Sequence, residues 1–399
     1  MTQAALEGLR VADFTIHAAG PFCTLLLAEL GAEVIKIESS ARLDIVRRPH
    51  PVYGRTEVPP FDMVNAGKRS VTLNLKTSKG VELAKRLVAV SDVVVENFRP
   101  GVMERLGLAY PVLREVRSDL IMLSISTSGQ TGPEREIAGY APMFAALGGL
   151  GELTGYADGP PVELRHAMDH ANGLVGVFAV LAALTHRRRT GQGQYIDLAM
   201  REVASSLIGE VLLAQAMNGE ASARMGNRDP AMVPHGVYPC TGADRWVAIA
   251  VGSDAEWRAL CRALGDPDWT RDPRLSDAVG RRAREDEIDM RLAEWCRERT
   301  PDEVMWRLQR AGVAATPSMS AEDLLQDLHL RERQAFPELV DPRRGRRQVV
   351  GPPWRLSATP ATVRKWSPDL GEDNRYVLSD LLGLTEAETE ALTAEGVVS

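Results

Sequence analysis

Short apolar runs alternate with amphipathic segments along the first half of the chain. The runs typical of strands lie at residues 9–15, 32–38, 69–75, 92–98, 119–126 and 193–200. Helices are predicted at 21–31 and 78–91, where Pro21 suits the first turn and Gly31 the end of the first helix. Strands that alternate with helices predict a parallel sheet with helices on its faces. We therefore expect a large doubly wound, Rossmann-like α/β domain.

The pattern changes in the second half of the chain. Two helices rich in apolar residues are predicted at 139–153 and 169–187, and a further helix at 200–217. Residues 221–235 are rich in Gly, Pro and Asn and have no clear period, so we place a domain boundary there. The segments predicted beyond it are a hairpin around the turn "TGAD" and helices near 254–265, 284–299 and 301–311. These elements predict a second, smaller α+β domain.

Composition narrows the class of protein. The chain has 399 residues, which is too long for one ordinary core, and its net charge of −7 does not suggest nucleic-acid or membrane-surface binding. The longest apolar run, 174–184, is too short to span a bilayer, and the N-terminus does not resemble a signal peptide. The four cysteines form no CxxC pair, which favours reduced, structural thiols. We expect a cytoplasmic protein.

Several common cofactor motifs are missing from the sequence. The first strand-to-helix junction carries only Gly20 where a dinucleotide-binding fingerprint needs several glycines, and neither a P-loop nor a GxSxG elbow is present. His166 and His170 are spaced to share one helix face and could hold a metal, but two partly exposed polar residues near a helix start are the favoured interpretation. We predict no metal site.

Asp169 stands at the start of the long apolar helix predicted at 169–187. Aspartate is a preferred N-cap residue, because its carboxylate accepts a hydrogen bond from an amide of the first turn. The positive end of a helix also stabilises a functional anion, so the residues alone leave a cap and a reactive carboxylate both open. The arginines Arg187 to Arg189 suit the negative end of the same helix and are interpreted as structural.

An ordered set of stretches covers nearly the whole chain and resembles one family. The stretches are "LEGLRVADFT", "AAGPFCTLLLAELGAEVIKIE", "NAGKRSVTLNLK", "VVVENFRPGVMERLGL", "LIMLSISTSGQTGP", "TGQGQYIDLAM" and "LGEDN" with "LLGLTEAETEALTAEGVV". Together they resemble the class III CoA-transferases of the CaiB/BaiF type, which include formyl-CoA transferase and carnitine CoA-transferase. The resemblance implies an interlocked homodimer with a discontinuous, CoA-binding catalytic domain at 1–220 and 331–399 and a small domain at 221–330.

The resemblance also implies a reaction. Asp169 matches the family nucleophile, which would move CoA from an acyl-CoA donor to a carboxylic acid through an aspartyl anhydride and an aspartyl-CoA thioester. Donor and product thioesters are similar in energy, so the missing P-loop is consistent with a reaction that needs no ATP. Coenzyme A is then a substrate, with no permanently bound cofactor and no metal. The implied partners are small molecules and a second copy of the chain, neither nucleic acid nor membrane.

The residues implied to bind CoA come from the first half of the chain. They are His17, Ala18, Arg42, Lys76, Asn97, Phe98 and Arg105. Asn97 and Phe98 stand at the carboxyl end of a predicted strand, where ligands bind in open α/β sheets. Arg105 offers a planar fork for phosphate. For Arg105 or Lys76 taken singly, a solvated surface cation is the commoner case.

Departures from the family pattern bear on the substrate. Ala18, with His17 beside it, replaces a glutamine of formyl-CoA transferase, and Ser39 replaces an arginine for which Arg42 could substitute. The segment 229–239 lacks the glycine run of the family's closing loop. These changes argue against formyl-CoA and oxalate. His235 in this segment can contact the acceptor acid or be a turn residue without a role.

A glycine run and one tyrosine leave alternatives open. The run Gly149–Gly151 either assists the reaction or ends a helix. Tyr140, a candidate substrate contact, stands where the 2-methylacyl-CoA racemases of this fold carry a histidine, and tyrosine is a poor base at neutral pH. Racemase is therefore the less favoured activity. A non-catalytic CoA-binding protein is the other alternative, and the presence of Asp169 argues against it.

Overall fold

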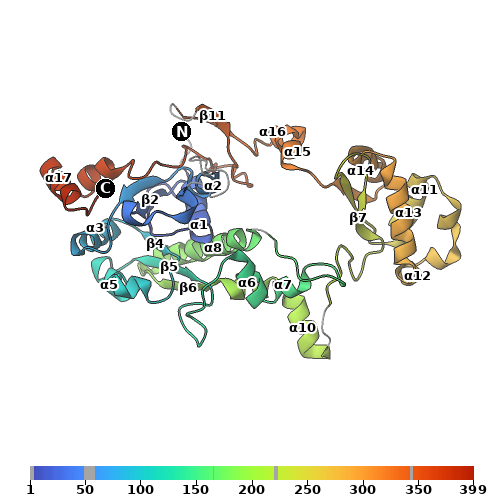
Figure 1. Ribbon diagram of the computed structural model, residues 1–399, viewed down its shortest axis with the longest axis horizontal. Coiled ribbons are helices and arrows are strands. Elements are labelled where there is room, and N and C mark those ends of the chain that lie inside the picture. Colours follow the sequence, from blue (N-terminus) through green and yellow to red (C-terminus); the bar gives the residue numbers. More distant parts are fainter. Residues whose placement is uncertain (1–3, 49–58, 165, 220–222, 342–344) are drawn as a thin grey trace. The chain divides into compact units, whose positions relative to one another are not determined.

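The computed structural model describes residues 4–48, 59–164, 166–219, 223–341 and 345–399 (Figure 1). The chain divides into two compact units, the first formed by Met1–Gly151, Glu163–Glu220 and His329–Ser399, and the second by Glu152–Val162 and Ala221–Leu328. Residues 220–222, at the predicted boundary, lie outside the described residues. The roles of the two units, as a CoA-binding domain and a small domain, stay predictions.

A six-stranded parallel sheet forms the centre of the first unit. Its strands are β1 (Arg10–Asp13), β2 (Glu33–Glu38), β3 (Arg69–Thr72), β4 (Val93–Glu96), β5 (Ile121–Ser126) and β6 (Tyr195–Ala199). The strand order is β3-β2-β1-β4-β5-β6, so β1 pairs with both β2 and β4. This confirms the predicted doubly wound fold. The order reverses at β1 and β4, and ligands of such sheets bind outside the carboxyl ends of the strands there.

Helices cover both faces of the sheet because alternate strand residues point to opposite sides. Val11 packs in one core and Ala12 in the other. The first core includes residues of α1 (Ala19–Glu29), α6 (Ala141–Leu147), α8 (Ala167–Thr190) and α9 (Met200–Ser206). The second includes residues of α3 (Ser78–Ala89), α4 (Val102–Arg105), α5 (Tyr110–Val116), the π-helix η5 (Tyr376–Leu381) and α17 (Glu386–Ala394) (Figure 1).

Three helix predictions need correction. The predicted helix 139–153 is two helices, α6 and α7 (Leu150–Leu153), because Gly148 ends α6 and Gly149 has a φ of 85°. That break supports the helix-end interpretation of the glycine run. The predicted helix 200–217 is α9 followed by α10 (Gly209–Asn218). Helix α8 begins at Ala167 and ends at Thr190, where Gly191 adopts the left-handed conformation.

Helix α8 packs one face into the core of the first unit. Its 24 residues are long and apolar enough to cross a membrane by length and composition alone, which the shorter run 174–184 did not suggest. In the first unit, however, it packs closely on α1. A Cβ atom on Gly173 would lie 2.8 Å from Cδ1 of Phe22 and 3.0 Å from the carbonyl oxygen of Ala19. The absence of a side chain at Gly173 therefore allows the two helices to approach each other.

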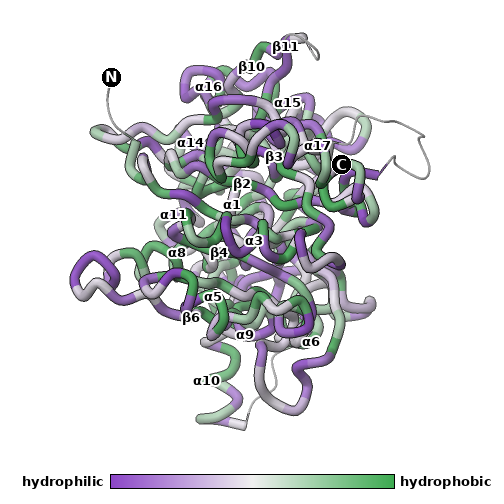
Figure 2. The backbone as a smooth tube through the Cα atoms, turned by 90° about the vertical axis from the view of Figure 1, so that its left-hand side faces the viewer, coloured by the Kyte–Doolittle hydropathy of each residue, from purple (hydrophilic) through white to green (hydrophobic). Residues whose placement is uncertain are grey.

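Helix α10 differs from α8 in having no buried residue. Hydrophobic residues run along it (Figure 2). Leu213 and Met217 are 62% and 78% exposed in the protomer. Single exposed apolar residues are common on protein surfaces, but several on one short helix favour an interaction surface.

The second unit contains a three-stranded antiparallel sheet of β7 (His235–Pro239), β8 (Trp246–Ala250) and β9 (Ala314–Pro317). The β7–β8 hairpin was predicted, whereas the short strand β9 was not. The sheet shares a core with α11 (Asp254–Leu264), α13 (Glu285–Arg297) and α14 (Pro301–Arg310). Thr300 caps α14 through a reciprocal capping box with Glu303.

The remaining elements are short. They are η1 (Ser40–Arg42), η2 (Ile45–Arg47), α2 (Pro59–Asn65), η3 (Asp268–Arg271), η4 (Pro273–Leu275), α12 (Ala278–Arg282), α15 (Ala321–Gln326), α16 (Leu328–Glu332), β10 (Glu338–Asp341) and β11 (Gly345–Gln348). The sequence did not predict the β10–β11 hairpin, and residues 342–344 of the arginine-rich stretch lie outside the described residues. All four cysteines are buried free thiols, as predicted.

Candidate active site

A buried ionic pair supports the loop that follows β1. Asp13, the last residue of β1, accepts hydrogen bonds from the backbone N–H of Thr15 at 2.8 Å and from the Thr24 hydroxyl at 2.7 Å. Nζ of Lys68 lies 3.1 Å from Oδ2 of Asp13, and both side chains are fully buried. Burial alone would raise the pKa of Asp13, but Lys68 and Lys36 lower it overall. Burial lowers the pKa of Lys68 to about 8.

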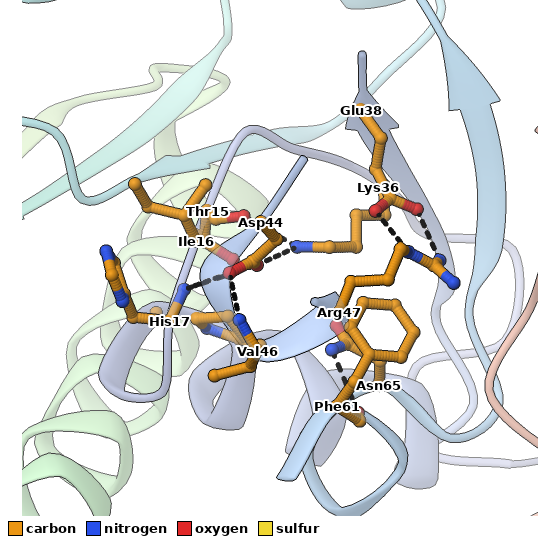
Figure 3. A network of polar contacts seen from close by, with 12 residues as sticks. Thr15, Ile16, His17, Lys36, Glu38, Asp44, Val46, Arg47, Phe61 and Asn65 are labelled. Atoms are coloured by element: carbon orange, nitrogen blue, oxygen red, sulfur yellow. Dashed lines mark hydrogen bonds and ion pairs between the residues drawn. The ribbon is translucent and has the colours of Figure 1, made fainter. Parts of the chain in front are cut away.

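Asp44 holds the same loop from the other side (Figure 3). Its two carboxylate oxygens accept a hydrogen bond from the backbone N–H of His17 at 3.1 and 3.2 Å. Lys36 donates to the carbonyl oxygen of Thr15 at 2.6 Å and lies 3.7 Å from the Asp44 carboxylate. Both charged side chains are almost fully buried. The backbone around His17 is therefore held in place by buried charged side chains.

Asn97 fixes the residue before His17. Its Oδ1 accepts from the backbone N–H of Ile16, and its Nδ2 donates to the carbonyl oxygen of Ile16, both at 2.8 Å. Asn97 directly follows β4, so the amide joins the loops after β1 and β4 at the point where the strand order reverses. The structure thus gives the Asn97 side chain a role in loop geometry, where the sequence suggested contact with CoA. Phe98, its neighbour, is half-buried against the second core.

Asp169 lies in the first turn of α8. The sequence suggested an N-cap, but the helix begins two residues earlier, and the N-cap position belongs to His166, whose φ is 59°. Nδ1 of His166 lies 3.7 Å from Oδ2 of Asp169. The Asp169 side chain is 15% exposed, against 55% for His166. The structure therefore corrects the cap interpretation and leaves a mostly buried carboxylate at the positive end of a long helix.

Three histidines surround this carboxylate. Burial raises the pKa of Asp169, while charges on His166, His170 and His17 oppose that rise. His17 comes from the loop after β1, and the Asp169 charge acts on it in return. Burial lowers the pKa of His17 overall, although Asp44 and Asp169 oppose that fall. Both groups lie in partly dehydrated surroundings that favour their neutral forms.

Aromatic contacts complete the cluster. The His17 ring meets the Tyr140 ring edge to face, with centroids 5.6 Å apart. Tyr140 occupies the N-cap position of α6 and is 60% exposed. The His170 ring packs on Phe22 of α1 at 4.5 Å, and its Nδ1 lies 2.7 Å from the carbonyl oxygen of His166. The cluster combines a carboxylate, imidazole N–H groups and a phenol from three segments of the first unit.

The other candidate CoA contacts lie at the surface or on the backbone. Ala18 occupies the N-cap position of α1. Arg42 in η1 is exposed, and its charge lowers the pKa of His17, so it lies near the cluster. Lys76 and Arg105 are exposed, and both interpretations of these cations stay open.

The second unit and the far end of α8 hold the remaining predicted residues. His235 is the first residue of β7 in the second unit, and its Nδ1 lies 2.6 Å from the carbonyl oxygen of Asn227. It is therefore a strand residue rather than a turn residue. Arg187 pairs with Asp92 at 3.1 Å, in line with a structural role.

Metal binding receives no support from the described part of the chain. No group of three or more His, Cys, Asp or Glu residues is arranged there to hold a metal ion.

The sequence analysis did not single out the charged residues that support the site. They are Asp13, Lys36, Asp44 and Lys68. One signal was available: Lys36 interrupts the apolar strand "EVIKIE", and a lysine within a buried strand requires a partner. The sequence does not show which carboxylate each buried lysine meets, because that depends on how the chain folds.

Comparison with known proteins agrees with this fold. The family model for CoA-transferase family III matches residues 6–374. The succinyl-CoA–D-citramalate CoA-transferase of Chloroflexus aurantiacus is 36% identical over 398 residues, which cover 98% of each chain. The beta subunit of that organism's succinyl-CoA–L-malate CoA-transferase is 34% identical, with 100% of this chain and 99% of the relative covered.

A solved structure shows the same architecture. The crystal structure of a CAIB/BAIF family protein from Brucella suis superposes with a TM-score of 0.86 at 32% identity, covering 96% of this chain and 100% of that one. The chain therefore belongs to CoA-transferase family III. Members of this family use CoA thioesters as substrates.

Proposed function

We propose that this protein is a CoA-transferase that moves CoA from succinyl-CoA to a four- or five-carbon dicarboxylic acid. The observation that carries the proposal is the mostly buried Asp169 carboxylate in the first turn of α8, surrounded by histidine side chains. The substrate class rests on relatives named for succinyl-CoA, D-citramalate and L-malate, which match this chain along nearly their whole length.

In the proposed reaction, the Asp169 carboxylate is the nucleophile, and the CoA thiolate is released and attacks again two times. A carboxylate oxygen of Asp169 attacks the thioester carbonyl of succinyl-CoA. The C–S bond breaks, CoA departs as the thiolate, and a mixed anhydride of Asp169 and succinate forms. The thiolate attacks the aspartyl carbonyl and releases succinate, giving an aspartyl-CoA thioester. The acceptor carboxylate then displaces CoA thiolate from this thioester and forms a second mixed anhydride with Asp169. The thiolate attacks the acceptor carbonyl of that anhydride. Asp169 is released as a carboxylate, and no proton is gained or lost overall.

The surroundings of Asp169 suit these steps. Partial burial removes water from the carboxylate, which leaves it more reactive and protects an anhydride from hydrolysis. The amides of the first turn of α8 supply positive partial charge that favours the ionised form, against the effect of burial on the pKa of Asp169. Burial lowers the pKa of His17, so this imidazole is mainly neutral at pH 7 and does not hold Asp169 in a tight ion pair. The carboxylate is therefore largely shielded from water and is free of a tight ion pair with His17.

CoA itself is proposed to bind at the carboxyl ends of β1 and β4. Phe98 offers a partly buried apolar surface there, and the backbone at Ala18 faces the same edge of the sheet. Arg42, Lys76 and Arg105 are exposed cations of the first unit and are the candidates for the CoA phosphates. Tyr140 and His235 remain proposed contacts for the acyl and acceptor groups, and the working form is proposed to be a homodimer in the cytoplasm.

The direct test is an acceptor and donor screen with purified protein. Succinyl-CoA with malate, citramalate or mesaconate should give the new thioester, whereas formate and oxalate should be poor acceptors. Asp169→Ala should lose transfer by at least about a thousandfold, as expected for removal of a covalent nucleophile. The control Asp380→Asn changes an exposed aspartate of the same unit and should keep wild-type turnover. Near-normal turnover by Asp169→Ala would rule out the mechanism.

Two other outcomes would identify a different function. Exchange of the α-proton of a 2-methylacyl-CoA with solvent deuterium, in the absence of any acid acceptor, would indicate a racemase. Tyr140 argues against that result, because a neutral phenol is a weak base at pH 7. Tight CoA binding without turnover of any donor, unchanged by Asp169→Ala, would indicate a binding protein.

A further inference from the structure

Two histidines beside Asp169 have an unusual backbone. Among the described residues, five that are not glycine have a positive φ, and two of them are His17 at 64° and His166 at 59°. This conformation is unfavourable for residues with a Cβ atom and is concentrated at functional sites. The Asp44 carboxylate holds His17 there, and His166 takes it as the residue from which α8 starts.

Both residues lie near the same carboxylate. His166 Nδ1 lies 3.7 Å from Asp169 Oδ2, which is an approach distance that a small movement converts into a hydrogen bond. His17 comes from a separate segment, the loop after β1, and lies close enough for its charge to act on Asp169. Asp169 therefore has an imidazole from its own helix end and another from the sheet edge.

We propose that His17 and His166 are positioning residues that first hold the Asp169 carboxylate and later hold the carboxylate of the acceptor acid. The inference rests on the proposed function, because it concerns the step at which Asp169 carries CoA. In the resting protein, the imidazole N–H groups face the Asp169 anion. Once Asp169 has become a thioester, it has no negative charge, and the same donors face an uncharged carbonyl.

An incoming carboxylate restores the lost charge at this place. Hydrogen bonds to an ionised acceptor are roughly twice as strong as those between neutral groups, so the donors prefer the acceptor anion to the thioester. Held there, an acceptor oxygen forms a C–O bond to the aspartyl carbonyl carbon, and the C–S bond breaks with the electron pair leaving on CoA thiolate. The imidazoles keep their protons throughout, so this is a binding role and not acid–base catalysis.

The charged groups around each histidine are compatible with a donor role. His17 faces Asp44, Asp169, Arg42 and Lys36, and its burial outweighs the two carboxylates. A mainly neutral imidazole still carries one N–H and can donate it. His170 differs, since its ring nitrogen is engaged with the helix backbone and its ring with Phe22. His170 is therefore not part of the proposed pair.

The two half-reactions separate this role from catalysis by Asp169. The first is formation of the Asp169 adduct from succinyl-CoA alone, followed by mass spectrometry. The second is acceptor turnover, followed as KM for malate or citramalate. We expect His166→Phe to raise the acceptor KM about tenfold or more, the size of one lost charge-assisted hydrogen bond, with adduct formation changed by less than about threefold. His166→Gln, which keeps an N–H donor, should recover most of the loss.

His17 is tested with His17→Gln and His17→Phe in the same way, and the glutamine variant guards against a loop that no longer folds. His186→Phe is the matched control, because this histidine is exposed on the same helix at its opposite end, and its variant should leave both half-reactions unchanged. An unchanged acceptor KM in His166→Phe and His17→Phe would overturn the inference. So would an equal loss in both half-reactions that glutamine does not restore. Absence of any Asp169 adduct in the wild-type protein would instead reject the proposed function.

Discussion

The side-chain amide of Asn97 pairs with both backbone polar groups of Ile16, at 2.8 Å each. This reciprocal pair joins the ends of β1 and β4, two strands that are neighbours in the sheet but separated by 81 residues between the paired positions. It fixes the residue directly before His17. The loop that approaches Asp169 is thus set by a residue that does not touch Asp169.

Replacement of Asn97 by Ala should destabilise the protein and reduce transfer together. Ile16 would lose a donor and an acceptor partner, which costs about 1–3 kcal/mol for partly buried groups. Urea unfolding gives the change in the free energy of unfolding, and steady-state kinetics gives the change in turnover. If Asn97 were instead a direct CoA ligand, the variant would show a raised KM for succinyl-CoA with an unchanged free energy of unfolding.

Gly173 should be intolerant of a side chain. A Cβ atom there would lie 2.8 Å from Phe22 and 3.0 Å from the backbone of Ala19, so α8 and α1 would have to move apart. We expect Gly173→Ala to lower the free energy of unfolding by about 1–3 kcal/mol, although alanine favours helices by about 1 kcal/mol elsewhere. Thermal unfolding measures this. The control Gly209→Ala in α10 has open space around it and should be neutral or slightly stabilising.

Glu96 should make stability fall as the pH rises. Burial raises its pKa to about 7, above the ordinary value of 4.5, although Ser124 and the Phe98 amide oppose the rise. A raised carboxyl pKa means that the folded protein binds the proton more tightly than the unfolded chain. The contribution is complete below pH 4.5 and is lost as the pH rises through 7, with a size of about 3 kcal/mol.

The variant Glu96→Gln should remove this contribution and be more stable than the wild type at pH 8, with a smaller difference at pH 5. Chemical unfolding at a series of pH values measures it. Glu390→Gln, at an exposed position on α17, should keep the wild-type pH dependence. A pH profile of Glu96→Gln that matches the wild type would show that folding does not raise the pKa of Glu96.

The sequence predicted the sheet better than the helix ends. Alternation of apolar runs with amphipathic segments was enough to predict a parallel sheet, because buried strands such as β4 and β5 are mostly apolar. The start of α8 was placed two residues late because an aspartate was taken as the cap. The structure begins that helix at Ala167 after a histidine in the left-handed conformation, which residue preferences do not anticipate.

The site was predictable only in part, for a physical reason. Asp169 and His17 could be named from a family resemblance, but their mutual closeness depends on the packing of α1 on α8 and on ionic pairs such as Lys68 with Asp13. Such pairs form between distant parts of the chain, and no local pattern records them. The strands β9 and β10 were missed for a similar reason, since each has only four residues and gains its hydrogen bonds from a partner strand.

The most direct measurement of the central claim is the mass of the peptide that carries Asp169 after the protein has been incubated with succinyl-CoA alone. We expect a covalent CoA adduct on Asp169, lost when a dicarboxylic acceptor is added and absent from Asp169→Ala. Turnover of succinyl-CoA and acceptor by a wild-type protein that carries no adduct, or an adduct found on another residue, would contradict it.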